Sequence, residues 1–542
     1  TTEIYTLSLH DALPISTIMN SSIIKALTLV TAGTTIAGCS SQQKSKQPNI
    51  IYIMSDDHAY QAISAYGYGL NETPNIDRLA KEGAIFTRAC VTNSISAPCR
   101  AVLLTGKHSF INGKIDNSVP FNWDQENFPK ILKANGYQTA MIGKIHLDGI
   151  PQGFDFSMVL PGQGQYYNPD FLIDGKKVRK EGYCTEIVTE TAIDWLKNKR
   201  DPDKPFCLLY HQKAPHRNWL PAPKYVNLYD DITFQPPANF FDDYSGRGRA
   251  AKEQEMKIDG HGQWGHDFKL IVDPNGDSTG FINDLRRMND EQRANWMAAY
   301  ESENQEFLKA KLTGKELALW KFNRYIKDYL RCIKSVDDGV GELLDYLKEA
   351  GLEENTIVIY TSDQGFYLGE HGWFDKRFMY EESFRTPLLM KYPKEIKSGT
   401  KIDKLVQNLD FAPTFLDYAG IKIPEDMQGM SFRKLVSGKS DSWRDAVYYT
   451  YYEYPAVHMV KRHYGVATER YKLMHFYYDI DEWEMYDLQT DPNEMKNIYD
   501  DPSYAGVREM LHKKLEELRK FYGDSDELND KFIKAFLDKQ KK

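Results

Sequence analysis

Two short stretches of the chain, far apart in the sequence, share one pattern, and this pattern constrains the fold more than any other feature. Residues 49–54 (NIIYIM) and 356–361 (TIVIYT) are apolar and rich in β-branched side chains. Continuous apolar runs of this length are typical of strands that are buried on both faces of a parallel sheet. Each run leads into acidic and polar residues, which are SDDH at 55–58 and SDQG at 362–365. Because open α/β sheets place their sites at the carboxyl ends of their strands, we expect a site there.

Helical and strand-like segments alternate through residues 46–430, which we expect to form one large domain. Further strands are predicted at 137–142, 206–210 and 386–391, and helices at 73–83, 126–135, 187–197 and 325–350. This alternation is typical of an α/β fold with a mixed, mostly parallel sheet flanked by helices. Residues 217–323 are polar and weakly periodic, and we expect them to form a long insertion of substrate loops over the carboxyl edge of the sheet.

Residues 431–542 have a different character and are predicted to form a smaller C-terminal subdomain. Tyrosine-rich segments of alternating polarity at 447–454, 464–468 and 471–476 indicate strands. A helix is predicted at 504–522. We therefore expect a small antiparallel sheet with a packed helix.

The N-terminal residues are expected to be processed rather than folded. Residues 1–18 resemble translated sequencing-adaptor sequence, so we expect a foreign leader. From Met19 the chain reads as an export signal, and Ala37-Gly38-Cys39 resembles a bacterial lipobox. This resemblance implies that residues 19–45 are a signal and tether, with Cys39 acylated after cleavage. The apolar run is too short for a permanent span, so we expect a lipoprotein in the periplasm or at the surface of a Gram-negative bacterium, bound to the membrane only through its lipid.

Charge and cysteine usage exclude some classes of protein. The net charge of −9 argues against nucleic-acid binding, which needs a basic surface. An anionic ligand must therefore be bound by basic residues gathered locally at its site. The six cysteines are scattered and show no CxxC spacing, so neither a metal-binding cysteine pair nor a disulfide framework is expected. Cys207 lies in an apolar run and is predicted to be a core residue.

Residues 94–106 (SISAPCRAVLLTG) read as the start of a helix. Ser96 is placed for an N-cap, and Pro98 falls in the first turn, where its missing N–H costs nothing. A helix N-terminus favours anions, and Arg100 adds a fixed positive fork there. A small nucleophile beside an anion site predicts ester hydrolysis at a charged centre. This stretch alone leaves open an ordinary capped core helix.

The same stretch resembles the signature of the sulfatase family, which reads Cys or Ser, any residue, Pro, Ser, Arg, and then a helix running to Thr-Gly. Cys99 stands where Ser, Thr or Ala is usual, and Ala101 where Gly is usual. Gly136 to Thr139 with Gly143-Lys144-Ile145-His146 resembles the second sulfatase signature, and Ala214-Pro215-His216 resembles a third basic segment. Residues 470–473, 484–488 and 491–494 resemble the C-terminal subdomain of the family.

Membership in this family would imply an alkaline-phosphatase-like fold and a defined catalytic set. Ser96 would be oxidised to formylglycine, whose hydrated aldehyde is the nucleophile, with Arg100 orienting its hydroxyls and Asp363 taking its proton. Lys144 and Lys376 would neutralise the sulfuryl oxygens. His216 with Lys376 would protonate the leaving oxygen, and His146 would draw the proton that expels sulfate.

The two strand ends also predict a metal site. They offer only oxygen donors, and three carboxylates favour Ca²⁺, with Mg²⁺ less favoured; zinc would call for His or Cys. The resemblance implies one Ca²⁺ held together with the formylglycine. The expected ligands are Asp56, Asp57, Asp363, Gln364 and residue Ser96.

A finer resemblance concerns the substrate. Residues 460–465 and 479–486 are most similar to bacterial N-acetylglucosamine-6-O-sulfatases that act on host glycans. This implies removal of 6-O-sulfate from N-acetylglucosamine in heparan-, heparin- or mucin-derived oligosaccharides, after maturation by an anaerobic, serine-type sulfatase-maturing enzyme. The alternatives are a sulfatase for galactose- or N-acetylgalactosamine-6-sulfate, a phospho-ester hydrolase of the same superfamily, and a glycan-binding lipoprotein whose Ser96 is never oxidised.

Aromatic and basic residues above the predicted site are candidates for sugar binding. Their side chains suit sugar hydroxyls and apolar ring faces, although packing at the domain junction is an equal alternative. The candidates are Arg217, Trp219, His371, Trp373, His458, Arg462 and His463.

Overall fold

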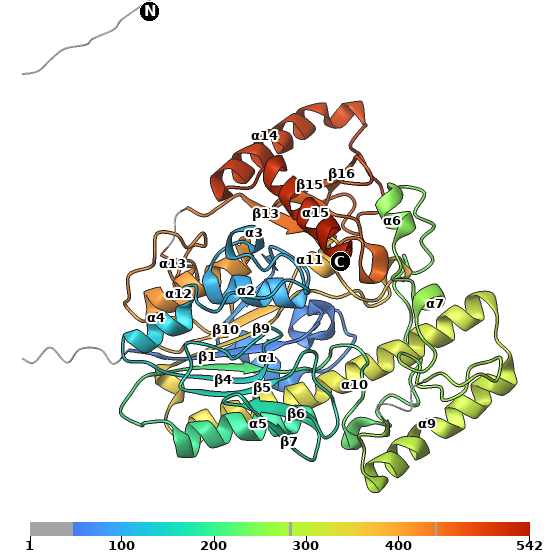
Figure 1. Ribbon diagram of the computed structural model, residues 1–542, viewed down its shortest axis with the longest axis horizontal. Coiled ribbons are helices and arrows are strands. Elements are labelled where there is room, and N and C mark those ends of the chain that lie inside the picture. The colour runs from blue at the N-terminus through green and yellow to red at the C-terminus, as the bar shows by residue number, and fades with distance from the viewer. Residues whose placement is uncertain (1–46, 281–284, 440–441, 542) are drawn as a thin grey trace, which may run out of the picture. The chain divides into compact units, whose positions relative to one another are not determined.

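The two apolar stretches are adjacent strands at the centre of the structure, a computed structural model that describes residues 47–280, 285–439 and 442–541 (Figure 1). β1 (Asn49–Ser55) pairs in parallel with β9 (Thr356–Ser362), and Ser55 lies opposite Ser362. The polar residues after both strands therefore meet at one edge of the sheet. On its other side β1 pairs with β8 (Phe206–His211), which pairs with β4 (Gln138–Lys144), again in parallel.

The full sheet has ten strands in the order β11-β2-β10-β9-β1-β8-β4-β5-β6-β7. Parallel pairing dominates its centre, and antiparallel pairs occur at β2–β10, β9–β10, β5–β6 and β6–β7. This confirms the predicted mixed, mostly parallel sheet. The remaining strands are β2 (Ala84–Phe86), β5 (Phe156–Leu160), β6 (Asp170–Ile173), β7 (Lys176–Arg179), β10 (Leu388–Lys391) and β11 (Thr400–Ile402).

Alternate side chains of β1 enter two different cores, as the two-residue period of a strand requires. Ile51 and Ile53 pack with α1 (Pro74–Glu82), α5 (Cys184–Asp194) and α10 (Gly314–Glu349). Ile50, Tyr52 and Met54 pack on the other face with α2 (Ser96–Thr105), α4 (Phe128–Ala134) and α12 (Phe411–Tyr418). Full burial of each large apolar side chain contributes about 1.5–3 kcal/mol, so helices on both faces fix the central strands that carry the site.

The predicted antiparallel sheet is present and has one more strand than expected. β13 (Ala446–Tyr451), β14 (His463–Thr468), β15 (Tyr471–Phe476) and β16 (Glu482–Asp487) pair in that order. α14 (Ala505–Tyr522) packs on this sheet through Leu511 and Leu515. The strand β16 was not expected, because its sequence, EWEMYD, carries charged residues that are usually exposed. Glu484 is buried there and accepts hydrogen bonds from two tyrosine hydroxyls. A second helix, α15 (Asp526–Gln540), follows α14.

The expectation of a weakly structured insertion at 217–323 is wrong in its second half. α9 (Asp290–Ala310) occupies part of it, and α10 begins at Gly314 rather than near residue 325. α9 buries only Trp296, Tyr300, Asn304 and Phe307, so its apolar period is masked by charged residues. Shorter elements are β3 (Ala89–Cys90), β12 (Val406–Gln407), α3 (Ser109–Asn112), α6 (Arg249–Glu253), α7 (Ile258–His261), α11 (Glu381–Phe384) and α13 (Arg433–Val436).

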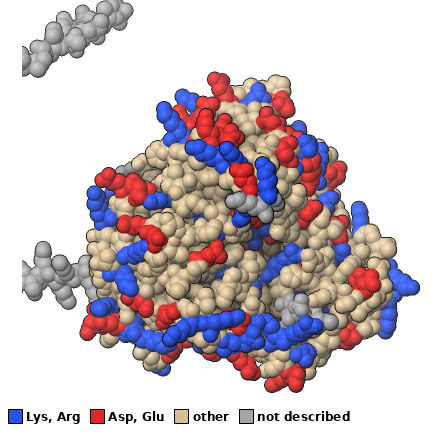
Figure 2. All heavy atoms as spheres, viewed as in Figure 1, with Lys and Arg blue, Asp and Glu red and all other residues tan. Residues whose placement is uncertain are grey.

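Residues 46–542 belong to one compact unit. The predicted leader, signal and lipidated Cys39 lie outside the described residues. In the described part of the chain, no helix combines the length and apolar character needed to cross a membrane. Acidic and basic side chains are interspersed on the face in Figure 2, apart from a row of basic residues along the edge that carries β6 and β7.

Candidate active site

The carboxyl ends of β1 and β9 bring four buried polar side chains together. Asp56, Asp57, Asp363 and Gln364 are each 0% exposed. The backbone N–H of Asp57 donates to Asp363 Oδ1 at 3.0 Å, and Gln364 Nε2 donates to the same oxygen at 2.8 Å and also to Asp57. Parallel pairing thus assembles the cluster that the two sequence stretches predicted.

Ser96 is the first residue of α2 and points its hydroxyl into this cluster. Its Oγ lies 2.6 Å from Asp363 Oδ2 and 3.0 Å from Asp56 Oδ1. The predicted N-cap role is wrong, since Ile95 occupies the cap position and no side chain caps the helix. The carboxylates at the strand ends take the hydroxyl that would otherwise bond to the backbone of the helix.

Three buried cations oppose the three carboxylates. Arg100 Nη2 lies 3.1 Å from Asp363 Oδ2 and 3.6 Å from Asp56 Oδ2, and Lys144, at the end of β4, contacts Asp56. Lys376 Nζ lies 2.7 Å from Asp57. Burial alone would raise the pKa of Asp363, but Arg100 and Lys144 lower it. Removing one partner from such a buried network typically costs about 3–5 kcal/mol, because the charge left behind is uncompensated.

Two predicted histidines border the cluster. His216 Nδ1 donates to the carbonyl of Arg217 at 2.6 Å, so its Nε2 is an acceptor, 3.7 Å from Asp57 Oδ2. His146 follows β4, and its Nε2 lies 3.3 Å from Gln163 Nε2. Burial and Lys144 lower the pKa of both imidazoles well below the usual value, so both are neutral at pH 7.

The donor set fits a hard divalent cation. Gln364 Oε1 is a buried oxygen without a hydrogen bond, and a half-turn of the amide would place it where Nε2 now lies, beside the carboxylate oxygens. Asp56 Oδ2 forms ion pairs with Lys144 and Arg100. Asp56, Asp57 and His216 each place a ligating atom within 4.8 Å of the other two. Carboxylate and amide oxygens are ligands that Ca²⁺ prefers, and His216 is a nearby nitrogen that the sequence did not place among them.

The two departures from the sulfatase signature are accommodated inside the protein. The thiol of Cys99 donates to the carbonyl of Asp363 and accepts from Asn408 Nδ2 at 3.1 Å. Burial raises the pKa of this thiol, so it stays neutral. Ala101 is fully buried against the core that contains α4 and α12. Cys99 therefore helps to hold Asp363, which is the contact a hydroxyl at this position could also make.

Five of the seven predicted sugar-binding residues lie in the core, which contradicts the predicted contact with a sugar. Trp219 and Trp373 are 1% and 0% exposed, and they pack against three and five aromatic rings. His371 bonds to Asp242, and His463 lies among the rings of the small sheet. Arg462 is 2% exposed and donates to the Tyr454 carbonyl. All five side chains therefore pack inside the protein, Trp219 within the core of the large domain.

The other two predicted residues lie beside the catalytic cluster. Arg217 directly follows His216, and its guanidinium pairs with Asp267 at 2.5 Å. His458 Nε2 lies 3.7 Å from Asp375 Oδ1, and Asp375 is the residue before Lys376. Both side chains are therefore on the side of the site that Lys376 and His216 face.

Sequence reasoning missed four polar residues at this side. Arg377 Nε donates to Asp375 Oδ2 at 2.6 Å, and Arg377 Nη1 donates to Glu453 at 2.8 Å. Glu453 accepts from the Asn117 backbone N–H at 2.9 Å, and Asn117 Oδ1 accepts from the Ala97 N–H at 3.2 Å. A continuous polar chain thus runs from Lys376 to the first turn of α2. The charges around Lys376 were visible in the sequence, but nothing linked Glu453 or Asn117 to them.

Three residues on this side have a strained backbone, as do Asp57 and His146 in the strand-end cluster. Asp375, Arg377 and His458 have φ values of 72°, 97° and 70°, in the left-handed region that most side chains avoid. Each such residue costs on the order of 1–3 kcal/mol, and clusters of them occur at functional sites.

Comparisons with known proteins agree with this geometry. A family model described as Sulfatase matches residues 48–421, and one described as the C-terminal part of N-sulphoglucosamine sulphohydrolase matches residues 369–521. The chain is 50% identical over 511 residues to an N-acetylglucosamine-6-O-sulfatase of Bacteroides thetaiotaomicron, covering 92% of this chain and 91% of that protein.

Solved structures agree as well. A protein in complex with its substrate D-glucosamine-2-N,6-O-disulfate is 50% identical, with a TM-score of 0.86 over 89% of this chain and 99% of that one. The phosphonate monoester hydrolase of Agrobacterium radiobacter is 20% identical, with a TM-score of 0.60 over 88% of this chain and 96% of that one, and shares the fold.

Proposed function

The chain belongs to the sulfatase family, and from this premise we propose that it removes the 6-O-sulfate of N-acetylglucosamine in sulfated glycans derived from heparan, heparin or mucin. The observation that carries the reaction class is Ser96, whose hydroxyl lies between two strand-end carboxylates and among three buried cations. The substrate is supported by the 50% identical N-acetylglucosamine-6-O-sulfatase and by the structure solved with a 6-O-sulfated glucosamine.

We propose that Ser96 is oxidised to formylglycine and that Asp56, Asp57, Asp363, Gln364 and residue 96 hold Ca²⁺. The formylglycine would supply a hydrated aldehyde as nucleophile, and the Ca²⁺ would supply positive charge for the sulfate oxygens. The fit rests on the cluster of carboxylate and amide oxygens and on the buried Gln364 Oε1, which has no hydrogen bond.

The side chains of the chain take definite parts in this proposal. Asp363 Oδ2, 2.6 Å from Ser96 Oγ, accepts the proton of the attacking hydroxyl, and Arg100 fixes that carboxylate. Lys144 and Lys376 offset charge on the sulfate oxygens in a dry site, where such charges are worth most. His146, neutral at pH 7, accepts a proton from residue 96 when sulfate leaves.

His216 and Lys376 serve the leaving oxygen of the sugar. Burial lowers the pKa of His216, but a bound sulfate adds negative charge beside the ring and raises that pKa again. Substrate binding therefore supports protonation of His216 where a proton is needed. Lys376, held between Asp57 and Asp375, supplies the second N–H group near that oxygen.

Recognition of the sugar is assigned to the polar side chains beyond Lys376. Asp375, Arg377 and His458, with Arg217, lie next to the two groups that serve the leaving oxygen. A carboxylate and a guanidinium side by side suit the hydroxyl groups of a sugar, which both donate and accept hydrogen bonds.

Maturation and location are proposed from the sequence. A serine at position 96 suits an anaerobic, serine-type maturing enzyme, and Ala37-Gly38-Cys39 suits lipidation at Cys39. We propose a lipoprotein of the periplasm or surface of a Gram-negative bacterium, tethered only by its lipid.

Comparative kinetics test the substrate. We expect the highest kcat/KM on 6-sulfated N-acetylglucosamine among the 6-sulfated forms of N-acetylglucosamine, galactose and N-acetylgalactosamine. A preference for either galacto-configured sugar by more than about 1.4 kcal/mol, a tenfold ratio, would overturn the substrate and leave the sulfatase reaction standing. Faster turnover of the matching phosphate esters would favour the phospho-ester alternative.

A further inference from the structure

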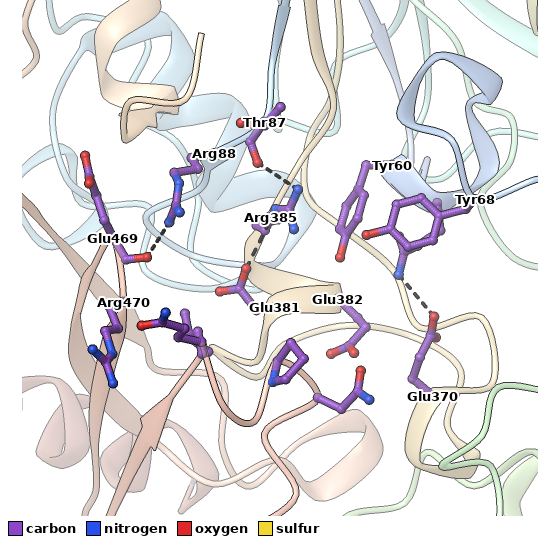
Figure 3. A pocket seen from close by; sticks show the side chains of 15 residues that line it. Tyr60, Tyr68, Thr87, Arg88, Glu370, Glu381, Glu382, Arg385, Glu469 and Arg470 are labelled. Atoms are coloured by element: carbon purple, nitrogen blue, oxygen red, sulfur yellow. Dashed lines mark hydrogen bonds and ion pairs between the residues drawn. The ribbon is translucent and has the colours of Figure 1, made fainter. Parts of the chain in front are cut away.

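A cavity of about 730 Å³ is lined by residues that follow β1 and by residues of and around α11. Tyr60 and Tyr68, after β1, line one wall, and α11 with Arg385 lines another (Figure 3). Among the described residues that line it, none belongs to the catalytic cluster. We call it the Glu382 cavity, after the buried residue of α11 in its wall.

Carboxylates outnumber cations around this cavity. Glu381 lies 2.9 Å from Lys472 Nζ and 3.7 Å from Arg385 Nε, and Glu494 shares the same lysine at 2.8 Å. Glu370 has only neutral donors, namely Gln61 Nε2 at 3.1 Å and the backbone N–H of Leu368 at 2.6 Å. The lining holds four carboxylates, Glu370, Glu381, Glu382 and Glu469, and three cations, Arg88, Arg385 and Arg470, while Lys472 and Glu494 lie beside Glu381.

Each of two buried side chains lining the cavity has one oxygen without a hydrogen bond. Glu382 is 5% exposed and its Oε2 has no hydrogen bond; Gln61 is 3% exposed and its Oε1 has none. Burial, with Glu370 and Glu494, raises the pKa of Glu382 well above its usual range. Both unpartnered atoms are acceptors once Glu382 is ionised, so they call for a ligand that donates hydrogen bonds and carries positive charge.

The aromatic wall suits the same kind of ligand. Tyr68 is 52% exposed, and its ring lies 5.6 Å from that of Tyr60. The Arg385 guanidinium already sits 4.2 Å from the centre of the Tyr60 ring, which shows that a cation can rest on this wall. Ring faces attract cations and also pack against the apolar faces of sugars.

We propose that the Glu382 cavity binds a hydroxylated organic ammonium ion, of the class of an amino sugar with a free amine. The ammonium group would bond to Glu382 and Gln61, and the rest of the ligand would lie along Tyr60 and Tyr68. A chelated metal ion is less suited, because among the described residues the glutamates of this cavity form no group of three with ligating atoms within 4.8 Å. This proposal is independent of the sulfatase reaction.

Titration calorimetry of the full chain with glucosamine, at a pH where its amine is protonated, tests the proposal. We expect binding that falls by about tenfold or more in Glu382→Gln, since a charge-assisted hydrogen bond is lost. Gln has nearly the same shape as neutral Glu, so the variant should keep its melting temperature. N-acetylglucosamine, which has no charge, should bind the wild type about tenfold more weakly or not at all.

Further variants separate this cavity from other sites. Glu354→Gln, the same change at an exposed position, should leave glucosamine binding within about twofold, as should Lys376→Ala in the catalytic site. Tyr68→Ala should weaken it about threefold or more. The proposal would be overturned if wild type and Glu382→Gln bound glucosamine equally, or if the wild type did not bind it at all. Loss of glucosamine binding in Lys376→Ala, or tight binding of N-acetylglucosamine, would also overturn it.

Discussion

The active site has two halves that are built differently. The strand-end half consists of residues directly after β1, β4 and β9, with Ser96 and Arg100 of α2, and its charges are balanced and buried. The loop half consists of Arg217, Asp375, Arg377, Glu453 and His458, on separate connecting segments. Left-handed backbone occurs in both halves, at Asp375, Arg377 and His458 and at Asp57 and His146. Regular elements fix the half that would handle the sulfate, whereas loops carry the half that faces the sugar. A family can change its sugar by altering loops while the sulfate chemistry stays in place.

The largest expected effect concerns Ser96, in the strand-end half. Protein made in a host without a serine-competent maturing enzyme should be folded and inactive on every sulfate ester, since an unmodified serine can be sulfated but lacks the second hydroxyl that expels sulfate. The mass of the peptide carrying Ser96 distinguishes the two forms, because formylglycine has two hydrogens fewer. Full turnover by protein with unmodified Ser96 would refute the proposed nucleophile.

The second largest effect is expected for Asp57→Ala, which should lower kcat by about 10³-fold or more on sugar and aryl sulfates alike. The substitution removes a carboxylate of the proposed Ca²⁺ site and the ion-pair partner of Lys376. Steady-state kinetics and elemental analysis measure the two effects. Asp345→Ala, at a side chain that is 63% exposed, is the matched control and should stay within about twofold. Stoichiometric zinc without calcium in active wild-type protein would contradict the metal assignment.

A smaller and more selective effect is expected in the loop half. Arg377→Ala should lower kcat/KM on 6-sulfated N-acetylglucosamine by about 10–100-fold, as loss of a charged hydrogen bond to the sugar does. It should change turnover of a small aryl sulfate, which has no sugar, by less than about threefold. Arg78→Ala is the surface control. Equal losses of kcat/KM on both substrates would show that the two halves do not differ in this way.

The smallest expected effect is on pH dependence. Neutral His146 is needed as a base, and burial with Lys144 lowers its pKa, so it stays unprotonated as the pH falls through the usual histidine range. The acid limb of kcat/KM should therefore lie below pH 6.5, the ordinary value. An acid limb at or above pH 6.5 that His146→Gln does not alter would show that another group limits the rate.

The strand-end half of the site could be predicted from the sequence, and the loop half could not. The strand-end half could be predicted because an apolar run followed by Asp is a local pattern and parallel pairing brings two such patterns together. The fold class was predictable for the same reason, but β5, β6, β7 and β16 were missed, and so was α9, whose apolar face lies among charged residues. The loop half was not predictable, since Glu453 and Asn117 reach Arg377 only through tertiary structure. Trp219 and Trp373 show the opposite error, because aromatic residues in polar segments look exposed and are in fact core.

The pairing of β1 with β9 also has a consequence for synthesis of the chain. Asn49 and its partner Thr356 are separated by 307 positions, and β8 lies between them in the sequence. At about 5–20 residues per second, the ribosome needs roughly 15–60 s after making β1 before β9 exists. Through that interval this fully buried strand has no partner on this side. The pairing that creates the catalytic centre is thus a late, long-range event, and residues 49–54 are the segment most in need of protection until it occurs.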